Sequence, residues 1–122
     1  MKVFIADDSK IFRERLKEML SELTKVEIIG EAEGALETTK RIRKLNPDVV
    51  ILDIRMPDGS GIDILKHIKK NNQTPVVIIL TNYPYPQYRK KCMESGADYF
   101  FKKSDEIEEV LVAFKQLIQD FQ

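Results

Sequence analysis

The 122-residue chain contains a single cysteine, no excess of charge of either sign and no long apolar run. Because Cys92 has no second cysteine to pair with, a disulfide within the chain is excluded, which predicts a cytoplasmic protein. Twenty basic residues balance twenty acidic ones, so we expect neither direct binding of nucleic acid nor attachment to an anionic membrane. No apolar segment approaches the ~20 residues that span a bilayer.

The chain also lacks repeats, low-complexity segments and linkers rich in glycine, serine or proline. Hydrophobic residues make up 43% of it and charged residues 33%, a balance typical of a globular protein. Its length suits one hydrophobic core, so we expect a single domain over residues 1–122.

Short apolar segments alternate along the chain with longer segments of helical periodicity. The expected strands are 3–6, 26–29, 49–52, 76–80 and 99–101. Helices are expected over residues 9–23 and 35–45, from residue 62 to Asn71–Asn72, over 86–95, and after Ser104. Ser9 is the expected N-cap of the first helix and Ser104 that of the last. This alternation predicts an α/β fold, in which a doubly wound parallel sheet is covered by helices on both faces.

Polar side chains follow four of the expected strands, at the point where each strand ends. They are Asp7 and Asp8 after the first strand, Asp53 after the third, Thr81 after the fourth and Lys103 after the fifth. The carboxyl ends of parallel strands share one edge of the sheet, and ligands of such sheets bind there. We therefore expect these side chains to converge on one site.

The chemistry of this set indicates phosphoryl transfer. Asp53 ends a buried run, where an isolated carboxylate is costly, and three nearby carboxylates repel one another unless a divalent cation binds. Oxygen ligands suit Mg²⁺, and a carboxylate is a nucleophile toward phosphorus. The sequence thus predicts an Mg²⁺ site at which Asp53 becomes an aspartyl-phosphate, with Thr81 and Lys103 each binding a phosphoryl oxygen.

At these positions the chain resembles the receiver domain of two-component response regulators. The motifs that carry the resemblance are Asp7-Asp8, Asp53 followed by Met56-Pro57, Thr81, Gly96-Ala97-Asp98 and Lys103. Together and in this order they are highly specific, and the resemblance covers essentially the whole chain. It implies a CheY-like, flavodoxin-type fold of five βα units with strand order 2-1-3-4-5, and Mg²⁺ as the cofactor.

The resemblance also implies the role of each acidic residue. Asp53 would accept a phosphoryl group from a sensor histidine kinase or a phosphotransfer protein. Asp8 and Asp53 would bind Mg²⁺ directly, together with the backbone carbonyl of Arg55, while Asp7 would act largely through water.

Thr81 and Phe100 occupy the switch positions that the resemblance implies. Thr81 would move toward the phosphoryl group, and the Phe100 ring would move inward at the same time. Lys103 would pair with the phosphoryl group, because it lies seven residues after Gly96 as the family's lysine does, and we expect Lys102 to point away.

Several residues depart from the family's usual pattern. Ser104 replaces a frequent proline, and Asn82 replaces the small residue that usually follows the switch threonine. Arg55 and Tyr83, each two residues after a site residue, are bulky at positions that influence the lifetime of the phosphoryl group in this family. Our hypothesis is that they shield the aspartyl-phosphate from water and slow its loss.

The expected output surface is formed by the helix 86–95, the strand 99–101 and the last helix. The resemblance implies that phosphorylation changes this face for binding a downstream protein effector, and a homodimer through the same face is a further expectation. Because no output domain follows, we expect a stand-alone receiver. The alternative is a receiver fragment of a longer DNA-binding response regulator.

Two other classes of protein would use similar residues. An Mg²⁺-dependent phosphatase with an aspartyl nucleophile usually has a second aspartate two residues later, where this chain has Arg55, so we predict that the chain is not an enzyme. A degenerate, purely structural receiver-like domain is disfavoured by the complete set of site residues. Taken alone, Asp7 and Asp8 would equally suit the start of a helix, so the prediction depends on the whole set.

Overall fold

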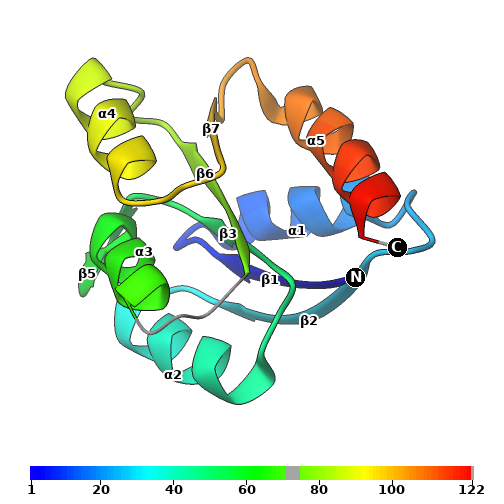
Figure 1. Ribbon diagram of the computed structural model, residues 1–122, viewed down its shortest axis with the longest axis horizontal. Helices are drawn as coiled ribbons and strands as arrows, with labels where there is room; N and C mark the ends of the chain where they lie inside the picture. Colours follow the sequence, from blue (N-terminus) through cyan, green and yellow to red (C-terminus); the bar gives the residue numbers. More distant parts are fainter. Residues whose placement is uncertain (71–74, 122) are drawn as a thin grey trace.

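A computed structural model of the protein describes residues 1–70 and 75–121. Within these residues, five parallel strands form one sheet in the order β2-β1-β3-β6-β7 (Figure 1). The strands are β1 (Lys2–Ala6), β2 (Glu27–Ala32), β3 (Val49–Leu52), β6 (Val76–Thr81) and β7 (Tyr99–Lys102). Since β6 and β7 are the fourth and fifth strands of this sheet along the chain, the predicted fold class and strand order are confirmed.

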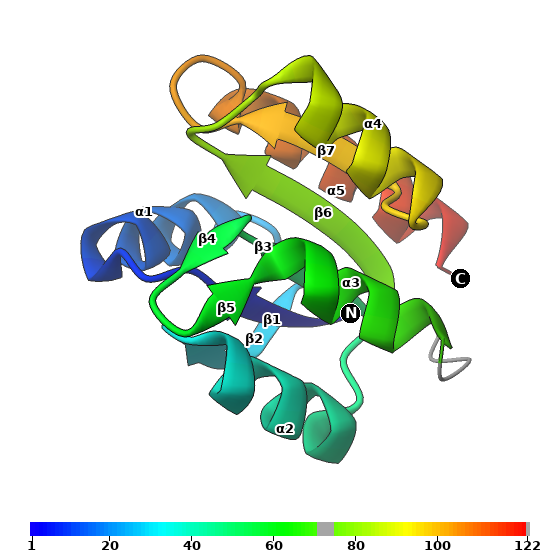
Figure 2. The same cartoon turned by 90° about the vertical axis from the view of Figure 1, so that its left-hand side faces the viewer.

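Helices cover both faces of this sheet. They are α1 (Lys10–Leu20), α2 (Ala35–Leu45), α3 (Gly61–Lys70), α4 (Pro86–Glu94) and α5 (Ile107–Asp120). Figures 1 and 2 show α1 and α5 on one face and the other three helices on the opposite face. Within the described residues, no helix has the length and apolar composition needed to cross a lipid bilayer.

The hydrophobic core has two halves because successive strand residues point to opposite faces of the sheet. Phe4 and Ile79 belong to the half that α2, α3 and α4 cover, whereas Ile5 and Ile78 belong to the half that α1 and α5 cover. Cys92 of α4 lies in the first half with no exposed surface, and burial raises the pKa of its thiol to about 11. The cysteine is therefore a core residue.

The start of α1 is confirmed, but its end differs from the prediction. The Ser9 hydroxyl oxygen accepts a hydrogen bond from the Phe12 amide at 3.2 Å, as an N-cap residue does. The helix ends at Leu20 rather than at residue 23, and the Ser21 amide donates to the Lys17 carbonyl at 2.9 Å in its last turn.

The predicted start of the last helix is wrong, because α5 begins at Ile107 and its N-cap position is Glu106. Ser104 lies in a turn between β7 and α5. This turn is held together by the Glu106 carboxylate, which accepts a hydrogen bond from the Lys102 amide at 3.0 Å. The predicted end of the third helix, at Asn71–Asn72, lies outside the described residues.

The turn-forming residues Asp58, Gly59 and Ser60 favour a loop after Asp53. The segment instead forms a small antiparallel hairpin of β4 (Arg55–Met56) and β5 (Gly59–Ser60). Asp58 at its turn accepts hydrogen bonds from the amides of Ala35 and Leu36, at 2.6 and 3.1 Å. These amides belong to the first turn of α2, and their hydrogen bonds lower the pKa of Asp58. The hairpin is thereby tied to α2.

Candidate functional site

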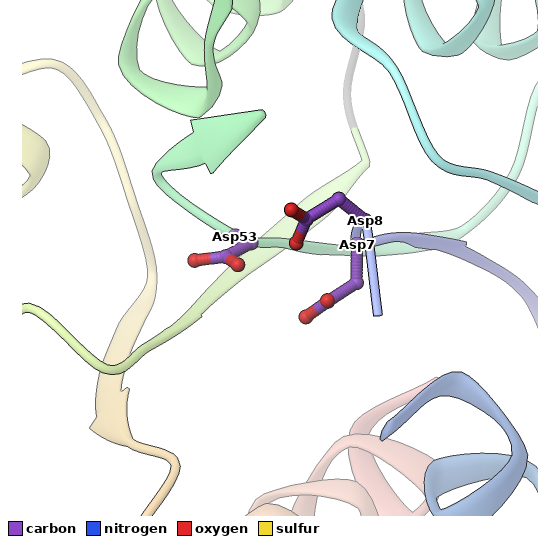
Figure 3. Close-up of side chains that lie close together, drawn as sticks. All are labelled: Asp7, Asp8 and Asp53. Carbon is purple, nitrogen blue, oxygen red and sulfur yellow. The ribbon is translucent and has the colours of Figure 1, made fainter. Parts of the chain in front are cut away.

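The site lies at the carboxyl edge of the sheet, where the strands deliver their predicted acidic residues. Asp7 and Asp8 follow β1, and Asp53 follows β3 (Figure 3). One carboxylate oxygen from each of the three lies within 4.8 Å of the others. Asp7 and Asp53 are 2% and 5% exposed, whereas Asp8 is exposed. The cluster therefore has a buried floor and one side open to solvent.

Backbone hydrogen bonds fix the two buried acids. The Asp7 amide donates to the Ala32 carbonyl at 3.0 Å, and the Asp53 amide donates to the Ala6 carbonyl at 3.0 Å. Both bonds continue the sheet ladder one residue beyond the strand ends. The pairing of the strands thus sets where these carboxylates start.

A close backbone contact fixes the chain after Asp53. The Gly61 amide donates to the Ile54 carbonyl at 2.7 Å, and a Cβ atom at Gly61 would collide with the Asp53 carbonyl oxygen. The Asp53 carboxylate in turn accepts from the Ile54 amide at 2.7 Å. Only glycine allows α3 to start this close to the acid.

Lys103 places its ammonium between two of the carboxylates. Its Nζ lies 2.6 Å from Asp7 Oδ2 and 3.0 Å from Asp53 Oδ2, and its side chain is 7% exposed. The ring of Phe12 covers the ammonium at 4.5 Å. Lys102 lies outside this cluster, half-exposed, with its Nζ 3.9 Å from Asp105.

Burial is the largest single influence on the pKa values of Asp53 and Lys103. It raises the pKa of Asp53, an effect that Lys103 opposes and Asp7 reinforces. Burial by itself would lower the pKa of Lys103, but its hydrogen bond to Asp7 and the charges of both acids outweigh this and raise it. Because three carboxylates share one ammonium, a further cation would stabilise the ionised cluster.

Thr81 and Phe100, the two predicted switch residues, are both buried. Thr81 has no exposed surface, and its hydroxyl oxygen accepts a hydrogen bond from the Tyr83 amide at 3.0 Å. Phe100 is 3% exposed, and the Arg89 guanidinium lies 5.3 Å from its ring centroid. The Phe100 ring already lies inside the fold in this structure. The expected inward movement would therefore have to start from a different, outward position of the ring.

Arg55 and Tyr83 make a contact that the sequence did not reveal. The Arg55 guanidinium carbon lies 4.1 Å from the Tyr83 ring centroid, and its Nη2 lies 3.4 Å from the Tyr88 hydroxyl. The Tyr85 ring lies 5.7 Å from the Tyr88 ring. We call these four residues the tyrosine clasp, because they join the hairpin after Asp53 to the start of α4.

Arg13 is a second residue that sequence reasoning missed. It is 8% exposed, and its guanidinium donates to the carbonyl oxygen of Asp7 at 2.6 Å. The available signal was its place on the buried face of α1, three residues before Leu16 and seven before Leu20. An arginine on such a face needs a buried acceptor.

A CheY-like parallel sheet with an acidic cluster at its carboxyl edge defines the class of this protein as a receiver module. The family described as response regulator receiver domain matches residues 3–115. The chain therefore belongs to the response regulator receiver domain family of two-component signalling.

Two curated proteins of similar sequence are longer than this chain. The chain is 39% identical over 106 residues to an uncharacterized response regulatory protein of Vibrio cholerae, covering 86% of this chain and 44% of that protein. It is 36% identical over 119 residues to the transcriptional regulatory protein BtsR of Escherichia coli, covering 95% of this chain and 48% of that protein. The chain thus spans less than half the length of these relatives.

Solved structures of response regulators share the fold. A DNA-binding response regulator of the LuxR family from Staphylococcus aureus matches with a TM-score of 0.88 and 30% identity, over 94% of this chain and 96% of that chain. The response regulator domain of CheB from Thermotoga maritima matches with a TM-score of 0.85 and 27% identity, over 98% of this chain and 94% of that chain.

Proposed function

We propose that Asp53 accepts a phosphoryl group from a sensor histidine kinase or a phosphotransfer protein. The observation that carries this proposal is the buried Lys103 ammonium between Asp7 and Asp53, with Asp8 on the open side. In the reaction, an Asp53 oxygen forms a bond to phosphorus while the bond from phosphorus to the donor imidazole nitrogen breaks. The imidazole leaves with the electron pair of that bond.

The residues present fit Mg²⁺, because the donors are carboxylate oxygens and the open side leaves room for the waters that this ion retains. Asp8, Asp53 and the backbone carbonyl of Arg55 would bind the ion, and Asp7 would act largely through water. When bound, the ion would neutralise charge on the phosphoryl oxygens. Lys103 holds a further phosphoryl oxygen through its ammonium.

The switch that follows phosphorylation involves Thr81 and the surface beyond it. To bind a phosphoryl oxygen, the Thr81 hydroxyl turns away from the Tyr83 amide that it now accepts from. This change biases the loop before α4 and the packing of Phe100. The surface formed by α4, β7 and α5 then binds a downstream protein effector or a second copy of the chain.

The whole of residues 1–122 forms one receiver domain in this proposal, with one phosphoryl transfer per chain and no turnover of phosphate esters. The match covers less than half of each of these relatives, so a receiver joined to a DNA-binding output domain is the alternative to a receiver that acts alone. The length of the native protein, measured by immunoblot of the source cells, distinguishes the two.

Intact-mass analysis tests the phosphorylation of Asp53 directly. After incubation with acetyl phosphate and Mg²⁺, we expect the wild-type protein to gain one phosphoryl group and Asp53→Asn to gain none. Asp48→Asn, which changes a carboxylate outside the cluster, is the matched control and should be modified like the wild type. An adduct on Asp53→Asn would show that another residue is the acceptor.

The tyrosine clasp supports a slow loss of the phosphoryl group, because Arg55, two residues after the acceptor, stacks on Tyr83, two residues after Thr81. We expect Arg55→Ala and Tyr83→Ala each to shorten the half-life of the phosphorylated protein severalfold. Arg89→Ala removes an arginine from a different ring, that of Phe100, and should change the half-life little. A wild-type half-life under a minute would contradict shielding.

A further inference from the structure

Arg13 lies beside the acidic cluster and contacts it through the backbone of Asp7. Its Nε donates to Glu31 Oε1 at 2.8 Å, and Lys17 Nζ binds the other oxygen of that carboxylate at 2.6 Å. Its Nη1 donates to the Asp7 carbonyl oxygen at 2.6 Å. A continuous series of contacts therefore runs from Asp7 through Arg13 and Glu31 to Lys17.

The Asp7 carbonyl belongs to the peptide unit that joins Asp7 to Asp8. A peptide unit is planar and rigid, so a contact that fixes its oxygen fixes the direction in which both residues leave it. The Asp7 carboxylate has further contacts, since its Oδ1 accepts from the Ser9 amide at 2.9 Å and its Oδ2 from Lys103. Asp8 is exposed, so this peptide is the rigid part that aims its carboxylate.

The Glu31 carboxylate offsets the positive charge of Arg13 beside the proposed Mg²⁺ site. An uncompensated guanidinium next to the acidic cluster would repel a divalent ion. Hydrogen bonds from Lys17 and Arg13 lower the pKa of Glu31, so its carboxylate remains ionised at neutral pH and offsets the Arg13 charge. What remains of Arg13 at the site is mainly its directional hydrogen bond.

We propose that Arg13 is a positioning residue of the Mg²⁺ site. Its hydrogen bond holds the Asp7–Asp8 peptide so that both carboxylates face Asp53. Glu31 orients Arg13 and neutralises it. This inference rests on the proposed function, since it requires that Mg²⁺ binds at the acidic cluster.

Mg²⁺ titrations followed by nuclear magnetic resonance test the proposal on wild-type protein, Arg13→Met and Lys17→Met. Lys17→Met is the matched control, because it removes a cation from the same Glu31 carboxylate and leaves the contact between Arg13 and Asp7 in place. We expect Arg13→Met to weaken Mg²⁺ binding about tenfold or more, as typical for residues that orient metal ligands. Lys17→Met should weaken it by less than about twofold, as expected for a half-exposed ion pair.

Three further measurements separate positioning from a general loss of folding. Thermal unfolding shows whether each variant is folded, and Arg13→Lys, which keeps the charge but cannot bind both acceptors in the same way, should recover only part of the affinity. With acetyl phosphate, Arg13→Met should reach the wild-type yield at saturating Mg²⁺, because Asp53 and Lys103 are unchanged. Equal losses of affinity in Arg13→Met and Lys17→Met would overturn this inference alone, whereas a wild-type protein that binds no Mg²⁺ would overturn the proposed metal site as well.

Discussion

Two clusters of charged side chains lie beside the end of β1, and they differ in their exposure to water. The buried cluster consists of Asp7, Asp53 and Lys103, whose side chains are 3%, 6% and 7% exposed. The half-exposed cluster consists of Arg13, Lys17 and Glu31, whose side chains are 10%, 30% and 31% exposed. Both contain the same kinds of ion pair at similar distances.

The two clusters shift carboxylate pKa values in opposite directions. In the buried cluster, loss of hydration is the largest influence, and it raises the pKa of Asp53 in spite of Lys103. In the half-exposed cluster, hydrogen bonds from Lys17 and Arg13 are the largest influences, and they lower the pKa of Glu31. Ion pairing therefore favours the ionised carboxylate in the half-exposed cluster. In the buried cluster, the loss of hydration makes the ionised carboxylate unfavourable in the folded protein in spite of its ion pair.

Removing the ammonium from the buried cluster should have the largest effect on stability. We expect Lys103→Met to lower the free energy of unfolding by about 3 kcal/mol without Mg²⁺, because it leaves two buried carboxylates unpaired. Urea denaturation at neutral pH measures this. The control is Lys102→Met, a change at the half-exposed neighbour that should cost less than about 0.5 kcal/mol. Equal losses in the two variants would contradict the role of burial.

Neutralising the acceptor should have a smaller effect of opposite sign. The pKa of Asp53 is higher in the folded than in the unfolded protein, so the cost of ionisation is absent below the unfolded pKa and complete above the folded pKa. We therefore expect Asp53→Asn to be more stable than the wild type at neutral pH without Mg²⁺, and the difference to vanish in acid. Denaturation curves at both pH values check this, and a loss of stability at neutral pH would count against it.

The half-exposed cluster should give the smallest effect. We expect Glu31→Gln to lower the free energy of unfolding by less than about 1 kcal/mol, and high salt to reduce the difference. Because the folded pKa of Glu31 is lowered, its contribution is present above its ordinary pKa and is lost as the pH falls through the folded value. Denaturation as a function of pH and salt tests this.

The comparison variant for Glu31→Gln is Glu14→Gln, which removes a carboxylate that binds Lys17, 2.8 Å from its Nζ, and is 56% exposed. It should change stability less than Glu31→Gln at neutral pH. The reverse order would mean that the contact with Arg13 adds nothing to the stability of the half-exposed cluster.

The sheet and the position of its acidic edge could be predicted because both depend on patterns that are local in sequence. The run that ends at Asp53 is apolar without interruption, and parallel strands bring its end to the same edge as Asp7 and Lys103, which lies 50 residues further along. The order of the strands and the choice of Lys103 over Lys102 came from the resemblance to receiver domains.

The contacts of Arg13 and Arg55 could not be predicted, because each depends on where a long side chain finds its acceptor across the fold. Nothing local in the sequence pairs Arg13 with the Asp7 carbonyl or places Arg55 against Tyr83 and Tyr88. The predicted start of α5 was wrong for a similar reason. A glutamate side chain, Glu106, completes the preceding turn, and its sequence position equally suited a first helical turn.

The buried Cys92 gives this protein an internal reporter of motion. It is the only cysteine in the chain and lies on the core-facing side of α4 with its thiol held protonated. A thiol reagent can react with it only when α4 separates from the sheet, so the rate of modification measures how often that opening occurs. Comparing this rate with and without a phosphoryl group on Asp53 would follow the movement of α4 in the unlabelled protein.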